Sequence, residues 1–240
     1  MDLQKYTDLA RKALKLRPCG AVIVAAGTAS RMGGIDKVMA PLRGQPMIVH
    51  TVRAFAACEA IREIVIVTRE DLIGPIMELC RGEEKVKAVV LGGASRQESV
   101  ELGLSMLSEK IQLAAVQDGA RPLVTPQLID RVVRAANSYA AAVPAVPVKD
   151  TIKICTGGLV DATPDRSRLF AVQTPQIFDL DLLKTALAAA EEQGFAMTDD
   201  CSAVEKLGMK VKVVAGEERN LKVTTPFDLK LAEMLMEEAQ

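Results

Sequence analysis

The first residues that could do chemistry lie in the segment GAVIVAAGTASRMGGIDK (20–37), which begins as an apolar strand. Its turn supplies three small residues and then two cations, in the order Ala25, Ala26, Gly27, Arg31 and Lys37. Small side chains let phosphate groups approach backbone N–H groups, and the N-terminus of a following helix attracts negative charge. A planar guanidinium and a compact ammonium group both suit a polyphosphate. We therefore expect an anion-binding loop directly after the first strand.

Two familiar phosphate-binding motifs do not fit this loop. A dinucleotide fingerprint requires G-x-G-x-x-G, but Ala29 and Met32 occupy the next two glycine positions after Gly27. The Walker pattern G-x-x-x-x-G-K-[ST] occurs nowhere in the chain. On its own, the loop could equally be a tight strand-to-helix turn with two solvated cations, because one small-residue loop is a weak signal.

A second glycine-rich turn occurs in LGGASRQESV (91–100). Its two glycines would allow a planar base to approach the backbone closely. Ser95, followed three residues later by Glu98, is the pattern of a helix capping box. Capping accounts for that pair but leaves Arg96 and Ser99 unexplained, so this turn is a second candidate binding segment.

The segment QDGARP (117–122) places Asp118 at the end of an apolar strand and Arg121 three residues later. The pair could face a ligand crevice, or it could be a surface ion pair worth at most about 1 kcal/mol. Lys222 is predicted to lie in a short strand before the last helix, which Thr225 caps and a proline opens. By itself Lys222 would be a solvated lysine.

The composition excludes several classes of function. The chain has 30 Lys and Arg against 31 Asp and Glu, so a net charge of -1 gives no reason to expect nucleic acid as a partner. Its single histidine, His50, has helical surroundings and is expected to be structural, which argues against histidine-based hydrolases and zinc sites. Five scattered cysteines without a C-x-x-C pair favour a reducing, cytoplasmic location. No apolar run reaches the roughly 18 residues of a membrane span.

The elements that must position these turns alternate along the chain. Buried strands are predicted at 21–27, 63–68, 87–93 and 113–119, and helices at 46–58, 71–81, 96–109 and 125–140. This alternation predicts an α/β fold with a mostly parallel, twisted sheet and helices on both faces. Ligands of such sheets bind beyond the carboxyl ends of the strands, where the turns described above would meet.

The pattern changes after residue 140. Residues 145–172 combine short strand-like pieces with a Gly-Gly turn and several prolines, which predicts a protruding β-hairpin arm. Helices at 179–193, 200–207 and 226–239 and a strand at 210–216 complete the expected fold. We expect one domain over 1–240, in which 1–17 form an amphipathic N-terminal extension.

Seven motifs together resemble one enzyme family. They occur in the order AAGTASRMGGIDK, GGASRQESV, QDGARP, VPVKDTIK, DRSRLFAVQTPQIF, TDDCSAVEKLG and NLKVTTPFDL. The set is similar to the 2-C-methyl-D-erythritol 4-phosphate cytidylyltransferase (IspD) family from about residue 21 to 235. The resemblance implies a Rossmann-like nucleotidyltransferase that transfers CMP from CTP to the alcohol phosphate, with Mg²⁺ on the triphosphate. The attacking phosphate is already ionised, so no general base is needed, and catalysis would consist of positioning and charge stabilisation.

The resemblance also implies roles for individual residues. The nucleotide would be bound by Ala25, Ala26, Gly27, Gly93, Ser99 and Gly119, and Arg96 would shape the cytosine loop. The catalytic cations would be Arg31, Lys37, Lys222 and Arg166, with Lys37 and Lys222 foremost in stabilising the transition state. The alcohol phosphate would be bound by Asp118, Arg121, Thr151, Arg166, Thr174 and Thr198. In the family the arm is exchanged in a homodimer, so that Arg166 would reach the partner's site.

The chain departs from the family pattern in three places. The loop from Arg31 to Lys37 is one residue short, with Asp36 where proline is usual, Val38 replaces a common glutamine, and Ala94 stands where an acidic residue is frequent. Two alternatives remain on the sequence alone: a ribitol-5-phosphate cytidylyltransferase, and a catalytically silent relative that acts as a binding module. A silent relative would be expected to lose its cations, and this chain retains them. The residues that would ligate a metal directly cannot be assigned from the sequence.

Overall fold

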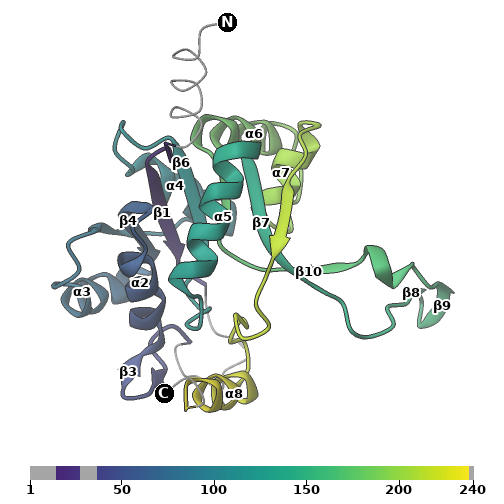
Figure 1. Cartoon of the computed structure of the whole chain (residues 1–240), viewed down its shortest axis with the longest axis horizontal. Coiled ribbons are helices and arrows are strands. Elements are labelled where there is room, and N and C mark those ends of the chain that lie inside the picture. Colours follow the sequence, from purple (N-terminus) through teal and green to yellow (C-terminus); the bar gives the residue numbers. More distant parts are fainter. Residues whose placement is uncertain (1–14, 28–36, 238–240) are drawn as a thin grey trace, which may run out of the picture.

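The structure is a computed structural model that describes residues 15–27 and 37–237 (Figure 1). The predicted N-terminal helix and Arg31 lie outside the described residues, apart from 15–17. The main sheet contains β1 (Cys19–Val24), β4 (Ile61–Thr68), β5 (Val86–Leu91), β6 (Leu113–Asp118), β7 (Ala141–Pro147), β10 (Phe170–Val172), β11 (Gln176–Asp179) and β12 (Lys212–Ala215). The described helices are α2 (Met47–Ala57), α3 (Glu70–Leu79), α4 (Arg96–Ser105), α5 (Pro126–Tyr139), α6 (Leu180–Glu192), α7 (Asp200–Lys206) and α8 (Pro226–Glu237).

The strand order β10-β7-β11-β6-β1-β4-β5 confirms the predicted α/β class. Strands β6, β1, β4 and β5 are parallel, whereas β11 pairs antiparallel to β6 and β7, and β12 adds to the far side of β7. The central strands are apolar along almost their whole length because helices cover both faces, which is typical of parallel sheets. The carboxyl ends of β1, β4, β5 and β6 therefore lie at one rim.

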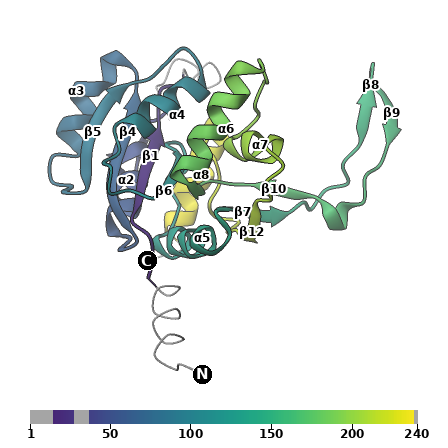
Figure 2. The same ribbon diagram turned by 90° about the horizontal axis from the view of Figure 1, so that it is seen from above.

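Helices α2 and α5 cover one face of the sheet, and α4 and α6 cover the other (Figure 2). Helix α5 buries Leu128, Val132 and Ala136 at helical spacing. The predicted cap is present, since the Thr125 hydroxyl accepts the Leu128 N–H at 3.1 Å. His50 lies on α2 with Nε2 at 2.8 Å from the Leu42 carbonyl oxygen, a structural contact.

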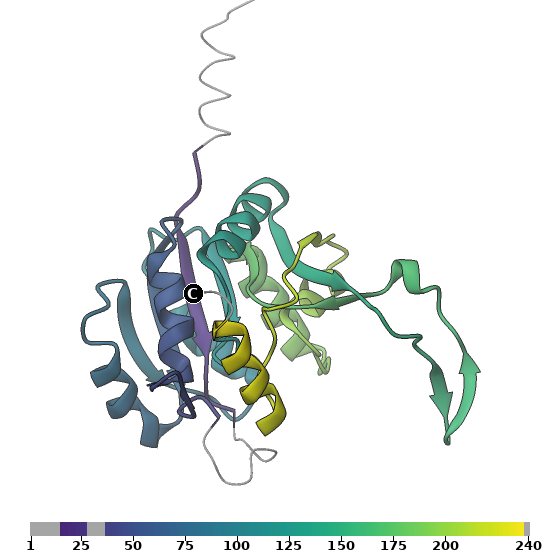
Figure 3. The same ribbon diagram turned by 60° about the horizontal axis from the view of Figure 1, so that its bottom comes forward.

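Helix α8 lies beyond the carboxyl end of β1 (Figure 3). It packs through Ala232 on a small apolar cluster that includes Leu42, Met47 and Val223. Leu42 belongs to β2 (Pro41–Leu42), which pairs with β3 (Gln45–Pro46). This cluster supports the segments that lead to Lys37 and Lys222.

The predicted arm protrudes from the body of the molecule (Figures 1 and 2). Its root is the antiparallel pair β7–β10, and its tip is the pair β8 (Ile154–Thr156) and β9 (Leu159–Ala162). Gly157 and Gly158 have φ of 59° and 85°, a conformation that glycine adopts at little cost. A 3₁₀ turn, η1 (Arg166–Arg168), interrupts the returning segment.

One element prediction is wrong. Lys222 does not lie in a strand, because residues 216–225 form neither helix nor strand. After β12 ends at Ala215, the chain leaves the sheet and crosses to the end of β6, where the Val223 N–H donates to the Ala120 carbonyl. Among the helices of the described ranges, none is long and apolar enough to cross a membrane.

Candidate active site

A cavity of about 500 Å³ opens at the carboxyl rim of the parallel strands. Its lining contains every residue predicted to bind the nucleotide: Ala25, Ala26, Gly27, Gly93, Ser99 and Gly119. Lys37 and Lys222 line the same cavity, although 185 positions of the sequence separate them. The ends of β1, β4, β5 and β6 and the segments of Lys37 and Lys222 thus converge on one space, which has the size of a small-molecule site.

A second cavity of about 400 Å³ lies beside the first. Its lining includes four residues predicted to bind the alcohol phosphate: Asp118, Arg121, Thr174 and Thr198. The two cavities share Arg96, Asp118 and Lys222. These three side chains therefore form the border between a larger compartment and a smaller one.

Asp118 lies at the centre of this border. Its Oδ2 is 2.9 Å from Lys222 Nζ and 3.4 Å from Arg121 Nε. Burial alone would raise the pKa of Asp118, but the charges of Lys222 and Arg121 outweigh it and hold that pKa below its usual range. Asp118 and Arg121 are both 9% exposed and line the second cavity, so they form a buried pair at the crevice and not the surface pair that the sequence left as an alternative.

The glycine-rich turn after β5 is braced by Ser99. The Ser99 hydroxyl accepts the Gly93 N–H at 3.1 Å and donates to the Ser95 carbonyl at 2.9 Å. The Ser95 hydroxyl caps α4 by accepting the Glu98 N–H. The Glu98 carboxylate accepts the N–H of Ala94, one residue before the position of a standard capping box. A Cβ on Gly93 would lie 2.3 Å from the Glu98 side chain, so glycine lets the turn stay this tight.

Arg96 is held by a partner that the sequence did not reveal. Its two terminal nitrogens donate to both carboxylate oxygens of Asp200, at 3.0 and 2.7 Å. Asp200 is fully buried at the start of α7, and burial raises the pKa of its carboxyl group against the opposing charge of Arg96. Gln176 orients this turn, since its Oε1 accepts the N–H groups of Asp200 and Cys201. The only sequence signal was the Asp-Asp pair at a helix start.

Asn220 and Gln173 were also missed, because amides in irregular segments carry no spacing pattern. The Asn220 amide donates to the Thr174 carbonyl at 2.9 Å, and Arg121 Nη1 donates to the Asn220 carbonyl at 2.6 Å. Both amide residues are buried, and Gln173 lines the second cavity.

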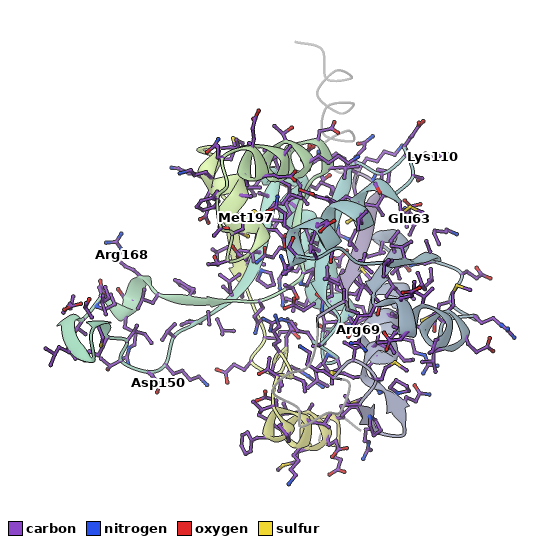
Figure 4. All side chains as sticks on the ribbon, turned by 180° about the vertical axis from the view of Figure 1, so that it is seen from behind. Glu63, Arg69, Lys110, Asp150, Arg168 and Met197 are labelled. Atoms are coloured by element: carbon purple, nitrogen blue, oxygen red, sulfur yellow. The ribbon has the colours of Figure 1, made fainter. Side chains whose placement is uncertain are left out.

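Two predicted substrate residues lie elsewhere. Thr151 and Arg166 are exposed on the arm and line neither cavity of their own chain, and Arg166 Nη1 donates to the Lys149 carbonyl at 2.7 Å. Figure 4 shows the neighbouring arm residues Asp150 and Arg168 far from Arg69, which lines the first cavity. The fold therefore separates these two residues from the rest of the predicted site. Arg31 lies outside the described residues.

The parallel sheet, the small-residue loop after β1 and the lysines at the rim define the class: a Rossmann-like α/β nucleotidyltransferase. Residues 19–238 match the family model of 2-C-methyl-D-erythritol 4-phosphate cytidylyltransferase (IspD). The chain belongs to this family.

Relatives along the whole chain agree with that assignment. The chain is 46% identical to the 2-C-methyl-D-erythritol 4-phosphate cytidylyltransferase of Symbiobacterium thermophilum, over 92% of this chain and 94% of the relative. It is 47% identical to that of Bacillus velezensis, over 90% and 94% of the two chains. The crystal structure of 4-diphosphocytidyl-2C-methyl-D-erythritol synthase from Anaerococcus prevotii superimposes with a TM-score of 0.85 at 30% identity, over 94% of this chain and 99% of that one.

Proposed function

We propose that this protein transfers CMP from CTP to 2-C-methyl-D-erythritol 4-phosphate and releases pyrophosphate. The observation that carries the proposal is the border of Lys222, Asp118 and Arg96, which the two cavities share. CTP would occupy the larger cavity and the alcohol phosphate the smaller one. Their reacting phosphates would then meet at Lys222, where an ammonium group can stabilise both.

The proposed reaction is an in-line displacement at the α-phosphorus of CTP. A phosphate oxygen of the alcohol phosphate forms the new P–O bond, and the bond to the bridging oxygen of pyrophosphate breaks. No proton has to be removed from the nucleophile, which is already an anion. Lys37 and Lys222 would neutralise charge that develops on the transferred phosphate, and Arg31 would bind the triphosphate.

Mg²⁺ is proposed as the metal of the triphosphate. Asp118 is the one carboxylate in the described lining of the first cavity, and its Oδ2 already contacts Lys222. Within residues 15–27 and 37–237, no group of three or more His, Cys, Asp or Glu residues could hold a metal ion. This donor set fits an ion bound mainly through phosphate oxygens and water, with at most one protein carboxylate. When bound, the ion would neutralise charge on the phosphates.

A homodimer is proposed because the arm leaves two predicted substrate residues unused. Arg166 and Thr151 contact neither cavity of their own chain. The arm also exposes apolar side chains at Leu159, Val160 and Phe170, with 75%, 60% and 46% exposure. Such an apolar surface is suited to burial against another chain. We propose that the arm enters the site of a second copy and supplies Arg166 there.

A mixing experiment tests this exchange. At an alcohol-phosphate concentration well below its KM, Lys222→Ala and Arg166→Ala chains would each be inactive or weakly active alone. If the arm is exchanged, a mixed dimer contains one site with both Lys222 and Arg166 intact, so mixing restores activity. If Arg166 serves its own chain, every site in the mixture lacks one residue and activity stays low.

A cytoplasmic location is proposed from the cysteines. Cys19, Cys58, Cys80 and Cys201 are buried and unpaired, and Cys155 is exposed and unpaired. Free thiols of this kind are typical of a reducing compartment.

The substrate is tested by pyrophosphate release from CTP in the presence of methylerythritol, ribitol or erythritol phosphate. We expect the highest kcat/KM with 2-C-methyl-D-erythritol 4-phosphate, in agreement with the relatives named above. Preference for ribitol 5-phosphate would refute the proposed substrate. No release with any alcohol phosphate, although CTP binds, would favour a silent binding module.

A further inference from the structure

Lys222 lies in a segment without regular secondary structure, so its position must be held by contacts other than the hydrogen bonds of a β-strand. Residues 216–225 form no helix or strand, and the Lys222 side chain is 42% exposed. Two residues earlier, Asn220 is completely buried. Just after the lysine, the Val223 N–H donates to the Ala120 carbonyl at 2.9 Å. The lysine therefore projects between two buried anchor points.

The Asn220 anchor belongs to a closed ring of contacts. The Asp118 N–H donates to the Thr174 hydroxyl at 3.1 Å, and Asn220 Nδ2 donates to the Thr174 carbonyl at 2.9 Å. Arg121 Nη1 donates to the Asn220 carbonyl at 2.6 Å, and Arg121 Nε lies 3.4 Å from Asp118 Oδ2. Lys222 returns to the same carboxylate oxygen at 2.9 Å. Arg121 and Lys222, the two cations that contact Asp118, are thus both linked to Asn220: the arginine by a hydrogen bond and the lysine by the chain itself.

Gln173 holds Asn220 from the side of the arm. Gln173 Oε1 accepts from Asn220 Nδ2 and from the Glu217 N–H, both at 3.3 Å, and Gln173 Nε2 donates to the Glu217 carbonyl at 2.8 Å. Gln173 directly follows β10, the returning strand of the arm, and its N–H donates to the Pro144 carbonyl of β7. The root of the arm and the lysine segment are therefore connected through two buried amides.

We propose that Asn220, held by Gln173 and Thr174, is the positioning residue that sets the location of Lys222 and Arg121 in the active site. This inference rests on the proposed function of Lys222 in CMP transfer. Asn220 reaches neither reacting phosphate itself, because its amide is directed at Gln173 and Thr174. It acts through Lys222, two residues further along the chain, and through Arg121, which donates to the backbone carbonyl of Asn220. Without the Asn220 amide, Lys222 would still be present but its ammonium group would be displaced. We expect this displacement to weaken stabilisation of the transition state more than it weakens CTP binding.

Kinetics in two backgrounds test the proposal. We expect Asn220→Ala to lower kcat by about 10- to 100-fold, with the KM for CTP changed by less than about threefold. When Lys222 is already alanine, the same change should cost less than about threefold, because residues that act as a unit are not additive. An equal loss in both backgrounds would show that Asn220 acts independently of Lys222 and would overturn the proposal.

Matched variants separate positioning from loss of folding. Gln173→Met removes the amide at similar size and should reproduce the kcat loss in part. Asn137→Ala removes another amide contact, a partly buried one to Arg17 at the opposite end of the sheet, and should leave kcat unchanged. Equal losses of kcat in all three variants at equal unfolding temperatures would contradict a specific role of Asn220.

Hydrogen exchange provides a measurement that does not depend on activity. Asn220→Ala should accelerate amide exchange in a peptide covering 217–225 and leave α5 unchanged, whereas unchanged exchange in 217–225 would refute the inference. Absence of CMP transfer in the unmodified protein would refute the proposed function instead. The exchange experiment would still decide whether Asn220 fixes the lysine segment.

Discussion

Lys222 Nζ lies 2.9 Å from Asp118 Oδ2, and this contact joins an irregular segment after β12 to the carboxyl end of β6. The ammonium group is thereby held at the border of both cavities while 42% of its side chain remains exposed to a ligand.

Lys222→Ala should reduce kcat strongly. We expect a loss of about 100-fold or more with less than about a threefold change in the KM for CTP, because the contact would form mainly in the transition state. Lys110→Ala, which removes an exposed lysine far from both cavities, is the control. Unchanged turnover in the Lys222 variant would show that this lysine does not act on the transferred phosphate.

Asp118→Asn should change how stability depends on pH. Because the pKa of Asp118 is lowered in the folded chain, its stabilising contribution is present above the unfolded-state pKa of about 3.9. The contribution is lost as the pH falls through the lower folded-state value. We therefore expect the difference in unfolding free energy between the two proteins to shrink as the pH falls below about 5. Urea unfolding measures it, and a difference that stays constant would contradict the assigned shift.

Asp200→Ala should destabilise the protein. The change leaves the Arg96 guanidinium without its carboxylate, and breaking a buried ion pair costs about 3 kcal/mol. We place the loss at or below that value because 35% of the Arg96 side chain is exposed. Asp181→Ala, at an exposed position in the first turn of α6, should change stability much less. Chemical unfolding of the two variants compares these costs directly.

Arg166→Ala should weaken binding of the alcohol phosphate and not of CTP. A charge-assisted hydrogen bond from arginine to phosphate is worth about 1.5 to 3 kcal/mol, so we expect the KM for methylerythritol phosphate to rise about tenfold or more. Arg168→Ala, two residues away on the same exposed turn, is the matched control. Calorimetry that finds weaker CTP binding and normal alcohol-phosphate binding would reverse the assignment.

Thiol labelling should distinguish one cysteine from the other four. Cys155 is exposed, whereas Cys19, Cys58, Cys80 and Cys201 are buried. Burial raises the pKa of Cys80 to about 11 and also raises the pKa of the other three buried thiols. At neutral pH we expect at most one thiol per native chain to react, and five after unfolding. Reaction of a second thiol in the native protein would contradict the packing described here.

The class of fold and most of the nucleotide site could be predicted from the amino-acid sequence. Alternating apolar strands and amphipathic helices are a local pattern, and in a parallel sheet every strand end reaches the same rim. The small residues after β1 and β5 and Asp118 at the end of β6 could therefore be assigned to one site from the sequence.

The pairing of the charged residues in that site could not be predicted, because it depends on how distant segments pack together. The contacts of Arg96 with Asp200, Lys222 with Asp118 and Arg121 with Asn220 join segments that no sequence period relates. The local sequence around Lys222 resembles a strand and predicted one. Its place is set instead by the buried Asn220 and by the hydrogen bond from the Val223 N–H to the Ala120 carbonyl. Side-chain contacts across long stretches of chain depend on the packed geometry, and local residue preferences carry no information about them.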